Sequence, residues 1–414
     1  MTTRRDFLAT SSLLGFGATV PAYLARTALA APNADKAGAK DTVLVVVQLT
    51  GGNDGLNTVV PFTNADYYKL RPNIAVAKDQ VKKLTDDVGL HPAMAALAKL
   101  YTDDSAVCVV QGVGYPNPSQ SHFRSMDVWH AASTADALTE GWLGQSLKKQ
   151  PVPAFHLAGG NETAPLALTG APVRVPSITS LDDFKLKTVS ANAADAAAQK
   201  SAITSAAPPV ANAPGSPNLL DFVSRTQMNT YASSEKLATI GKNYTPKVPY
   251  PTSALANKLK LAAQLIDAGI GARLFYVSID GFDTHAGQGG ATGAHANLLT
   301  QVSEAISAFY RDMASRGHDK RLCVMTFSEF GRRAYENGSK GTDHGAGAPM
   351  FLIGGGVKAG VVGEHPSLKG LKEGNLVHGT DFRQVYAAVL DGWLGVDSKP
   401  IVGDGFKAVE VFAK

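Results

Sequence analysis

The amino-acid sequence predicts an α/β protein with a mostly parallel central sheet and helices on both faces. Continuous runs of β-branched and other apolar residues, at 41–52 and 105–114, are typical of strands that are buried on both faces. Such runs alternate along the chain with amphipathic helical runs. Because parallel strands need a crossover connection, which is usually a helix, this alternation indicates a parallel sheet that is covered on both sides.

The elements follow one another in a regular order with one interruption. We expect strands at 41–52, 105–114, 272–280, 321–327 and 348–356, and helices at 251–271, 295–317 and 380–395. The stretch 187–217 is rich in alanine, serine and proline and poor in large apolar residues, which indicates a surface excursion or a partly ordered cap. We therefore expect one domain over 31–414 that carries this insertion.

The first thirty residues are typical of a twin-arginine export signal. Arg4 and Arg5 precede a weakly apolar stretch at 8–24, and small residues at 28–30 form a cleavage site. A membrane anchor is the alternative, but glycine, serine and proline interrupt the stretch, and no other run reaches the roughly 18 residues of a spanning helix. We expect the twin-arginine translocase to export the chain and residues 1–30 to be removed. The mature protein is then periplasmic or secreted and makes no membrane contact.

Composition and charge restrict the class of function. The chain has 414 residues, of which 44% are hydrophobic and 18% are charged, as in an ordinary globular protein. Its net charge of +4 is spread without a basic block, so nucleic acid is not an expected partner. Cys108 and Cys323 lie in apolar runs and are expected in the core, and the sequence leaves open whether they pair.

Candidate metal ligands occur where the predicted strands end, which is where open α/β sheets bind their ligands. Asp54 follows the first strand and two glycines, a setting that suits a metal ligand and also an Asx-turn or a helix cap. Asp280, Asp283 and His285 leave the strand at 272–280 together. We expect Asp280 to cap the turn and Asp283 and His285 to bind metal, with a plain polar loop as the alternative.

Two further segments next to predicted strands carry candidate ligands. Glu329 lies just past the strand at 321–327 and is either a ligand or an ion-pair partner of Arg332 and Arg333. Asp343 and His344 stand between glycines on a loop that precedes its strand instead of following it. This doublet is expected to reach the site from an adjacent turn, and a solvated loop is the alternative.

Ser121 is the candidate nucleophile, with His122 beside it as the second candidate catalytic residue. Prolines and polar residues precede them, and apolar positions then follow at helical spacing, so Ser121 is expected at a helix N-terminus. Free backbone N–H groups and the helix dipole favour an anion there, and a serine beside a divalent metal can attack phosphorus or sulfur. Ser121 can equally be a simple helix cap.

These residues together resemble a known family, the exported bacterial proteins called domain of unknown function 1501. That family in turn resembles the alkaline phosphatase and sulfatase superfamily. The likeness covers nearly the whole mature chain and rests on the twin-arginine start and, in order, on "VVVQLTGGNDGLNTVVP", "PNPSQSHF", "SIDGFDTHAGQ", "TFSEFGR", "GTDHGAGAPMFLIGGGV" and "TDFRQVYAAVLDGWLG". It implies an alkaline phosphatase-like fold with a site for one or two divalent ions, whether zinc, manganese, magnesium or calcium.

The resemblance also implies roles. Asp54 and Ser121 match the superfamily's early Asp and its nucleophile, and Asp283 with His285 matches its mid-chain Asp-and-His pair. The Asp-His doublet that the superfamily carries after the strand at 321–327 is replaced here by Ser328-Glu329, so His344 is expected to supply the last histidine, with Asp343 beside it. The second metal position then lacks a histidine and is weak or empty.

Two functions of different class follow. The first is a metal-dependent hydrolase that acts on small anionic phosphate or sulfate esters, with Asp54 and Glu329 on one metal and Asp283, His285 and His344 on the other. The second is an exported binding or assembly protein that uses the same scaffold for a structural metal or an anion. A serine hydrolase of the α/β type is disfavoured because the chain contains no G-x-S-x-G motif.

Overall fold

A computed structural model describes residues 23, 41–160, 162–184 and 244–413. The predicted signal peptide lies outside these residues except for Tyr23, whose ring packs edge-on against Phe155. The Ala/Ser/Pro-rich stretch at 187–217 lies wholly outside them. In the part of the chain that is described, no helix has the length and apolarity to cross a membrane.

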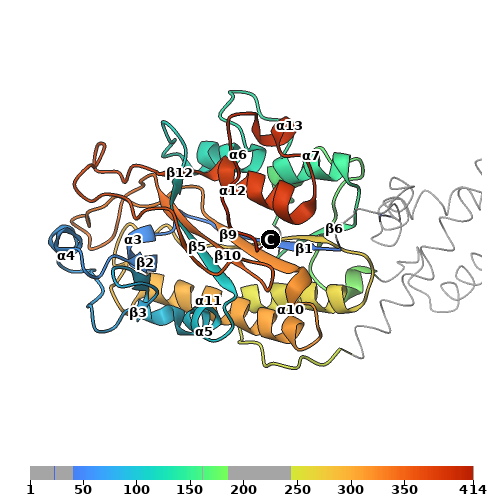
Figure 1. The fold of residues 1–414 in the computed structure, drawn as a ribbon, viewed down its shortest axis with the longest axis horizontal. Coiled ribbons are helices and arrows are strands. Elements are labelled where there is room, and N and C mark those ends of the chain that lie inside the picture. Colours follow the sequence, from blue (N-terminus) through green and yellow to red (C-terminus); the bar gives the residue numbers. More distant parts are fainter. Residues whose placement is uncertain (1–22, 24–40, 161, 185–243, 414) are drawn as a thin grey trace, which may run out of the picture.

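A mixed, mostly parallel sheet forms the centre of the molecule (Figure 1), as the sequence predicts. Its strands are β1 (Val43–Leu49), β5 (Val107–Gly114), β6 (Ala154–Leu157), β7 (Ser177–Ile178), β8 (Leu274–Ile279), β9 (Leu322–Phe327), β10 (Ala348–Ile353), β11 (Gly360–Val362) and β12 (Thr380–Asp381). The order across the sheet is β11-β5-β10-β9-β1-β8-β6-β7, with β12 also paired to β5. Only β10 runs antiparallel to its neighbours β5 and β9. A small second sheet has the order β2-β4-β3, from β2 (Val59–Val60), β3 (Lys82–Lys83) and β4 (Gly89–Leu90).

Helices cover both faces of the sheet (Figure 1). One face carries α5 (Ala95–Thr102), α10 (Ala254–Asp267) and α11 (Ala294–Ala314), and the other carries α6 (His122–Ala131), α7 (Trp142–Lys149), α12 (Phe382–Ala387) and α13 (Lys399–Val402). The short α3 (Gly55–Thr58) and α4 (Ala65–Leu70) follow β1. Single turns of 3-10 helix lie at Pro92–Met94, Leu166–Leu168, Leu181–Phe184 and Asp319–Arg321, and a π-helical segment at Ala388–Leu394 continues α12.

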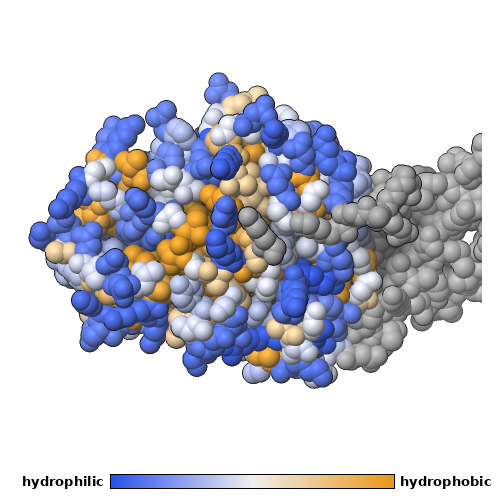
Figure 2. Space-filling view, viewed as in Figure 1, coloured by the Kyte–Doolittle hydropathy of each residue, from blue (hydrophilic) through white to orange (hydrophobic). Residues whose placement is uncertain are grey.

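The alternation of side chains along β1 divides the core in two. Val45 and Val47 pack with α5, α10 and α11, while Leu44 and Val46 pack with α6, α7 and α12. Successive residues of a strand point to opposite faces, so a continuous apolar run can fill both cores. Polar residues cover most of the face seen in Figure 2, and apolar residues gather near its middle.

The two cysteines lie in this core and do not pair. Cys108 is on β5 and Cys323 is on β9, and both thiols are free and buried. Burial raises the pKa of the Cys108 thiol to about 12 and raises the pKa of Cys323 as well. Both thiols are therefore protonated and act as small apolar side chains.

Candidate metal centre

The sheet topology brings four loops to one edge. Strands β1, β8 and β9 are parallel, so the loops that follow them leave the sheet at the same carboxyl edge. Because β10 is antiparallel to β9, the loop that precedes it, 338–347, arrives at that edge too. This direction is the physical reason why Asp343 and His344 lie before their strand and still reach the site.

Helix α6 adds a fifth segment at this edge. Ser121 occupies the N-cap position, as predicted, and His122 is the first helical residue. The buried Ser125 Oγ donates to the backbone oxygen of Glu329 at 2.5 Å, which fixes the first turn of the helix beside the loop after β9. His122 therefore faces the loops after β8 and β9 instead of standing apart beside the serine.

Three imidazoles at this edge are held in the same way, by the Nδ1 nitrogen. The Nδ1 atom of His122 lies 2.8 Å from Glu329 Oε1, that of His285 lies 3.2 Å from Asp343 Oδ1, and that of His344 lies 2.8 Å from the backbone oxygen of Gln120. All three partners are acceptors, so each Nδ1 carries the hydrogen. In the neutral imidazole the Nε2 nitrogen then presents a lone pair, which is the arrangement of a metal-ligating histidine.

These Nε2 atoms converge on the carboxylate of Asp283. The Nε2 atoms of His285 and His344 are 2.9 Å apart, and each lies 3.1 Å from Asp283 Oδ1. His122 Nε2 lies 3.6 Å from Asp283 Oδ2, and ligand atoms of His122, Asp283 and His344 all fall within 4.8 Å of one another.

A cation fits this arrangement. Two lone pairs that face each other at 2.9 Å repel unless a proton or a metal ion lies between them. Ligands bound about 2.1 Å from one ion are about 3.0–3.4 Å apart, which matches the separations among Asp283, His285 and His344. We name this group, His122, Asp283, His285 and His344, the histidine centre.

Arg332 keeps Asp283 ionised. Partial burial raises the pKa of Asp283, but the hydrogen bond and the positive charge of Arg332, together with the neighbouring His344 and His285, outweigh it and hold that pKa at about 2. Arg332 Nη2 lies 2.6 Å from Asp283 Oδ1 and leaves Oδ2 free of the guanidinium. Burial lowers the pKa of His344, which favours the neutral imidazole that a metal requires.

Asp54 does not join the histidine centre, which corrects the prediction of a metal ligand there. Its carboxylate is fully buried and accepts from Arg71 Nη1 at 2.5 Å, Arg71 Nη2 at 2.9 Å and Gln288 Nε2 at 2.5 Å. Burial raises the pKa of Asp54, but the charge and hydrogen bonds of Arg71 lower it on balance. Asp54 stands before α3 without making a side-chain cap, so the helix-cap alternative fails as well.

Glu329 and Asp343 bind Nδ1 atoms of the histidine centre and do not belong to the group of atoms that converges on Asp283. Glu329 is fully buried and accepts from the Gly51 N–H and from His122, both at 2.8 Å. Asp343 accepts from Asn337 Nδ2 at 2.9 Å and holds His285. In the structure both carboxylates bind imidazoles, whereas the sequence analysis expected Asp343 as a ligand and Glu329 as either a ligand or an ion-pair partner of Arg332 and Arg333.

Other predicted residues take simpler places. Asp280 accepts from the Gly281 N–H at 2.7 Å and caps its turn as expected. Ser121 is exposed at the start of α6, and its side chain makes no capping hydrogen bond. Arg332 pairs with Asp283 and not with Glu329, so the ion pair weighed for it in the sequence involves another carboxylate.

Sequence reasoning gave no role to Arg71, Gln120 and Gln288. Arg71 and Gln288 bind Asp54, and the backbone of Gln120 binds His344. Gln288 stands in the motif "DTHAGQ", three residues after His285, and this proximity is the one signal that could have marked it. Arg71 lies in an ordinary helix end and gives none.

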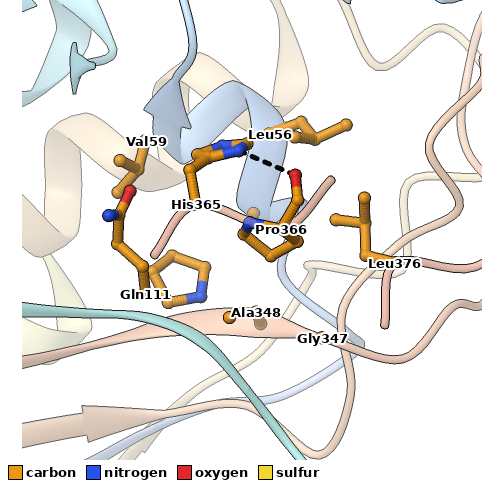
Figure 3. Close-up of a pocket in the computed structure, with 11 residues that line it drawn as sticks. Leu56, Val59, Gln111, Gly347, Ala348, His365, Pro366 and Leu376 are labelled. Carbon is orange, nitrogen blue, oxygen red and sulfur yellow. Dashed lines mark hydrogen bonds between the residues drawn. The ribbon is translucent and has the colours of Figure 1, made fainter. Parts of the chain in front are cut away.

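Figure 3 shows a small pocket, which is lined by residues outside the histidine centre. It lies between α3, β5 and the start of β10, and its lining includes Gln111, Gly347, His365 and Leu376. It has room for about one water molecule. Its lining contains none of the predicted site residues, so it does not extend the site.

Comparisons with known proteins agree with the resemblance seen in the sequence. A family model described as "Protein of unknown function (DUF1501)" matches residues 41–401. A search of curated proteins found no match.

Several solved structures are similar to this chain at a low level. A sulfatase from Pseudoalteromonas sp. is 12% identical, with a TM-score of 0.37 over 98% of this chain and 77% of that chain. The alkaline phosphatase of the Antarctic bacterium TAB5 is 10% identical, with a TM-score of 0.31 over 78% of this chain and 95% of that chain. The C-terminal periplasmic domain of EcEptC from Escherichia coli, in complex with zinc, is 11% identical, with a TM-score of 0.35 over 77% and 74%. At TM-scores this low the likeness carries no argument about the activity of this chain.

Proposed function

The chain belongs to the family of proteins of unknown function DUF1501, and we propose that it is an exported, metal-dependent hydrolase of phosphate or sulfate esters. One observation carries the proposal: three imidazoles present Nε2 lone pairs toward one carboxylate, beside a serine at a helix N-terminus. With the hydrogens on Nδ1, two Nε2 atoms 2.9 Å apart repel each other unless a metal ion or a proton lies between them.

The donor set suggests which ion is bound. Three imidazoles and one carboxylate suit zinc or another transition metal such as manganese better than magnesium or calcium, which prefer oxygen ligands. A divalent ion in the histidine centre would supply Lewis-acid polarisation of the ester oxygen.

The residues of the chain supply the rest of the reaction. Ser121 has a free hydroxyl, and we assign it as the nucleophile that attacks phosphorus or sulfur while the alcohol leaves. The free N–H groups in the first turn of α6 and the helix dipole favour the anionic ester there. Glu329 binds Nδ1 of His122, and the backbone oxygen of Gln120 binds Nδ1 of His344, so both rings are held in place. Water then hydrolyses the ester formed on Ser121 and releases phosphate or sulfate.

The test is turnover of chromogenic phosphate and sulfate esters by the metal-loaded protein. We expect hydrolysis of at least one of the two, and a loss of at least about a thousandfold in Ser121→Ala with unchanged metal content, as is typical for removal of a nucleophile. A protein that binds metal but turns over neither ester would instead support an exported binding or assembly protein.

Export is a separate part of the proposal. Arg4 and Arg5 are the residues that the twin-arginine receptor would read. Changing both to lysine should leave the unprocessed precursor in the cytoplasm. Normal processing of that variant into the periplasm would refute the proposed route.

A further inference from the structure

Two arginines that pair with predicted metal ligands, Arg71 with Asp54 and Arg332 with Asp283, are fully buried. Arg71 is 0% exposed and Arg332 is 1% exposed. A buried guanidinium needs acidic and carbonyl partners, because burying an unpaired charge is costly. The partners of these two arginines therefore show which acidic groups near the centre are already neutralised.

Arg71 forms an ion pair with the carboxylate of Asp54. It bonds both oxygens of that carboxylate, and its remaining N–H groups go to Asn57 Oδ1 and to the backbone oxygens of Arg333 and Ala334. Gln288 Nε2 also donates to Asp54 Oδ2. Arg71 therefore donates to both oxygens of Asp54 and balances the charge of its carboxylate.

Arg332 lies behind Asp283 and joins three loops. Its Nε donates to the Gly52 oxygen at 2.7 Å, its Nη1 to the Thr342 oxygen at 2.8 Å, and its Nη2 to Asp283 Oδ1 and to the oxygens of Phe282 and Gly51. The loops after β1 and β8 and the loop before β10 are thus tied to one fixed positive charge. That charge lies against Asp283 Oδ1.

Glu329 is engaged through one of its oxygens. Its Oε1 accepts from the Gly51 N–H and from His122 Nδ1, both at 2.8 Å. Ser328 Oγ lies 3.1 Å from Oε2, but its hydrogen is directed to the Leu49 backbone oxygen at 2.7 Å. Asp54 is therefore engaged at both oxygens by a guanidinium, and Glu329 is engaged at Oε1 by an imidazole and a backbone N–H.

We infer that the histidine centre holds a single divalent ion, and that the guanidinium of Arg332 takes the place of a second one. The inference rests on the metal centre of the proposed function and specifies its charge. A second cation at Asp54 would have to displace the guanidinium of Arg71, and one next to Asp283 Oδ1 would meet the guanidinium of Arg332. Like charges repel each other, so the ion is accepted only between the imidazoles and Asp283.

The experiment is a calorimetric titration of the metal-free full-length protein with Zn²⁺. We expect saturation at one equivalent per chain. Two equivalents of comparable affinity would overturn the inference and leave the proposed metal centre standing. No binding at all would refute the metal centre itself, so the two failures are distinguishable.

A pair of acid-to-amide variants adds a matched control. Asp283→Asn should weaken Zn²⁺ binding by more than about tenfold, whereas Asp54→Asn, which keeps an acceptor for Arg71, should keep one equivalent with an affinity within about threefold of the parent protein. Loss of an equivalent in Asp54→Asn would show that Asp54 is a ligand and would overturn the inference. Circular dichroism checks the fold, and if Asp54→Asn is unfolded, the stoichiometry of the parent protein decides.

Discussion

At the scale of single residues, the histidine centre depends on which nitrogen of each ring is held. Glu329, Asp343 and the Gln120 carbonyl each bind an Nδ1 atom, so the Nε2 atoms of His122, His285 and His344 are left to converge. These contacts with the Nδ1 atoms fix both the orientation and the tautomer of each ring. A change at Glu329 or Asp343 therefore acts on metal affinity through an imidazole and not directly.

The sequence identifies these residues as candidates for a site, but it does not assign a role to each of them. Asp283, His285, Asp343 and His344 stand out because each lies beside a predicted strand on a polar, glycine-rich loop. Which of them bind a metal and which support a ligand depends on contacts between segments far apart in the chain, such as the one between His122 and Glu329, 207 positions apart. Residue patterns do not carry that information.

His344 gives the sharpest residue-level prediction. His344→Ala should lower metal affinity by more than about a hundredfold, because removal of a direct ligand costs more than the tenfold to hundredfold typical of supporting residues. The matched control is His378→Ala, a partly buried histidine before α12, which should keep its metal. Metal analysis after dialysis compares the two. Full metal content in His344→Ala would remove it from the ligand set.

At the scale of elements, the direction of β10 determines whether Asp343 and His344 lie at the same edge of the sheet as Asp283. If β10 ran parallel to β9, its preceding loop would lie at the opposite edge of the sheet from Asp283. The sequence predicts the strand and the unusual order of loop and strand, but not the direction of pairing. The direction of β10 depends on its pairing with β9, which directly precedes it in the chain, and with β5, which is distant in the sequence.

The glycines of this loop are required by close approach. Gly345 lies against the backbone of Arg332, and Gly341 lies against that of His285, so a Cβ at either position would clash. Gly338, in the same loop, has no atom within 4 Å of where its Cβ would be. Glycine is thus required at two positions of this loop by the close approach of another backbone segment.

This contrast is testable with two alanine variants. Gly345→Ala should displace His344 and weaken metal binding by at least about tenfold, whereas Gly338→Ala should leave metal affinity unchanged, because a misplaced ligand weakens a metal site much as a lost support does. Titration with Zn²⁺ measures both. Equal affinities for the two variants would mean that the contact at Gly345 does not position the ligand.

At the scale of the whole molecule, the predicted layers are confirmed. Apolar runs and their alternation with helices are strong local signals, and they give the sheet, both helix layers and the buried cysteines. The signals fail for β6, β7, β11 and β12, which have two to four residues each and too few apolar positions to show a pattern. The pairing of Asp54 with Arg71 was also hidden, because the sequence does not show that the chain buries both.

Buried histidines make the stability of the molecule depend on pH. Burial lowers the pKa of His130 to about 3 and that of His295 to about 4, whereas in the unfolded chain each titrates near 6.5. As pH falls from about 6.5 to 4, the unfolded chain therefore takes up protons that the folded protein does not. Each histidine lowers the free energy of unfolding by up to about 1.4 kcal/mol per pH unit over this range.

Urea unfolding between pH 7 and pH 4.5 measures this effect. His130→Gln can still bond Gln48 and Tyr276 but does not titrate, so its stability should fall less steeply with acid than that of the parent protein. Parallel curves for the two proteins would show that His130 is not held neutral by the fold.

The location of the ion is the most direct test of the central claim that the three imidazoles and Asp283 form a metal centre. Crystals of the protein grown with zinc, measured at the zinc absorption edge, should show an anomalous peak about 2.0–2.2 Å from the Nε2 atoms of His122, His285 and His344 and from Asp283. A peak on Asp54 or Glu329, or no peak at the histidine centre with zinc in excess, would contradict it.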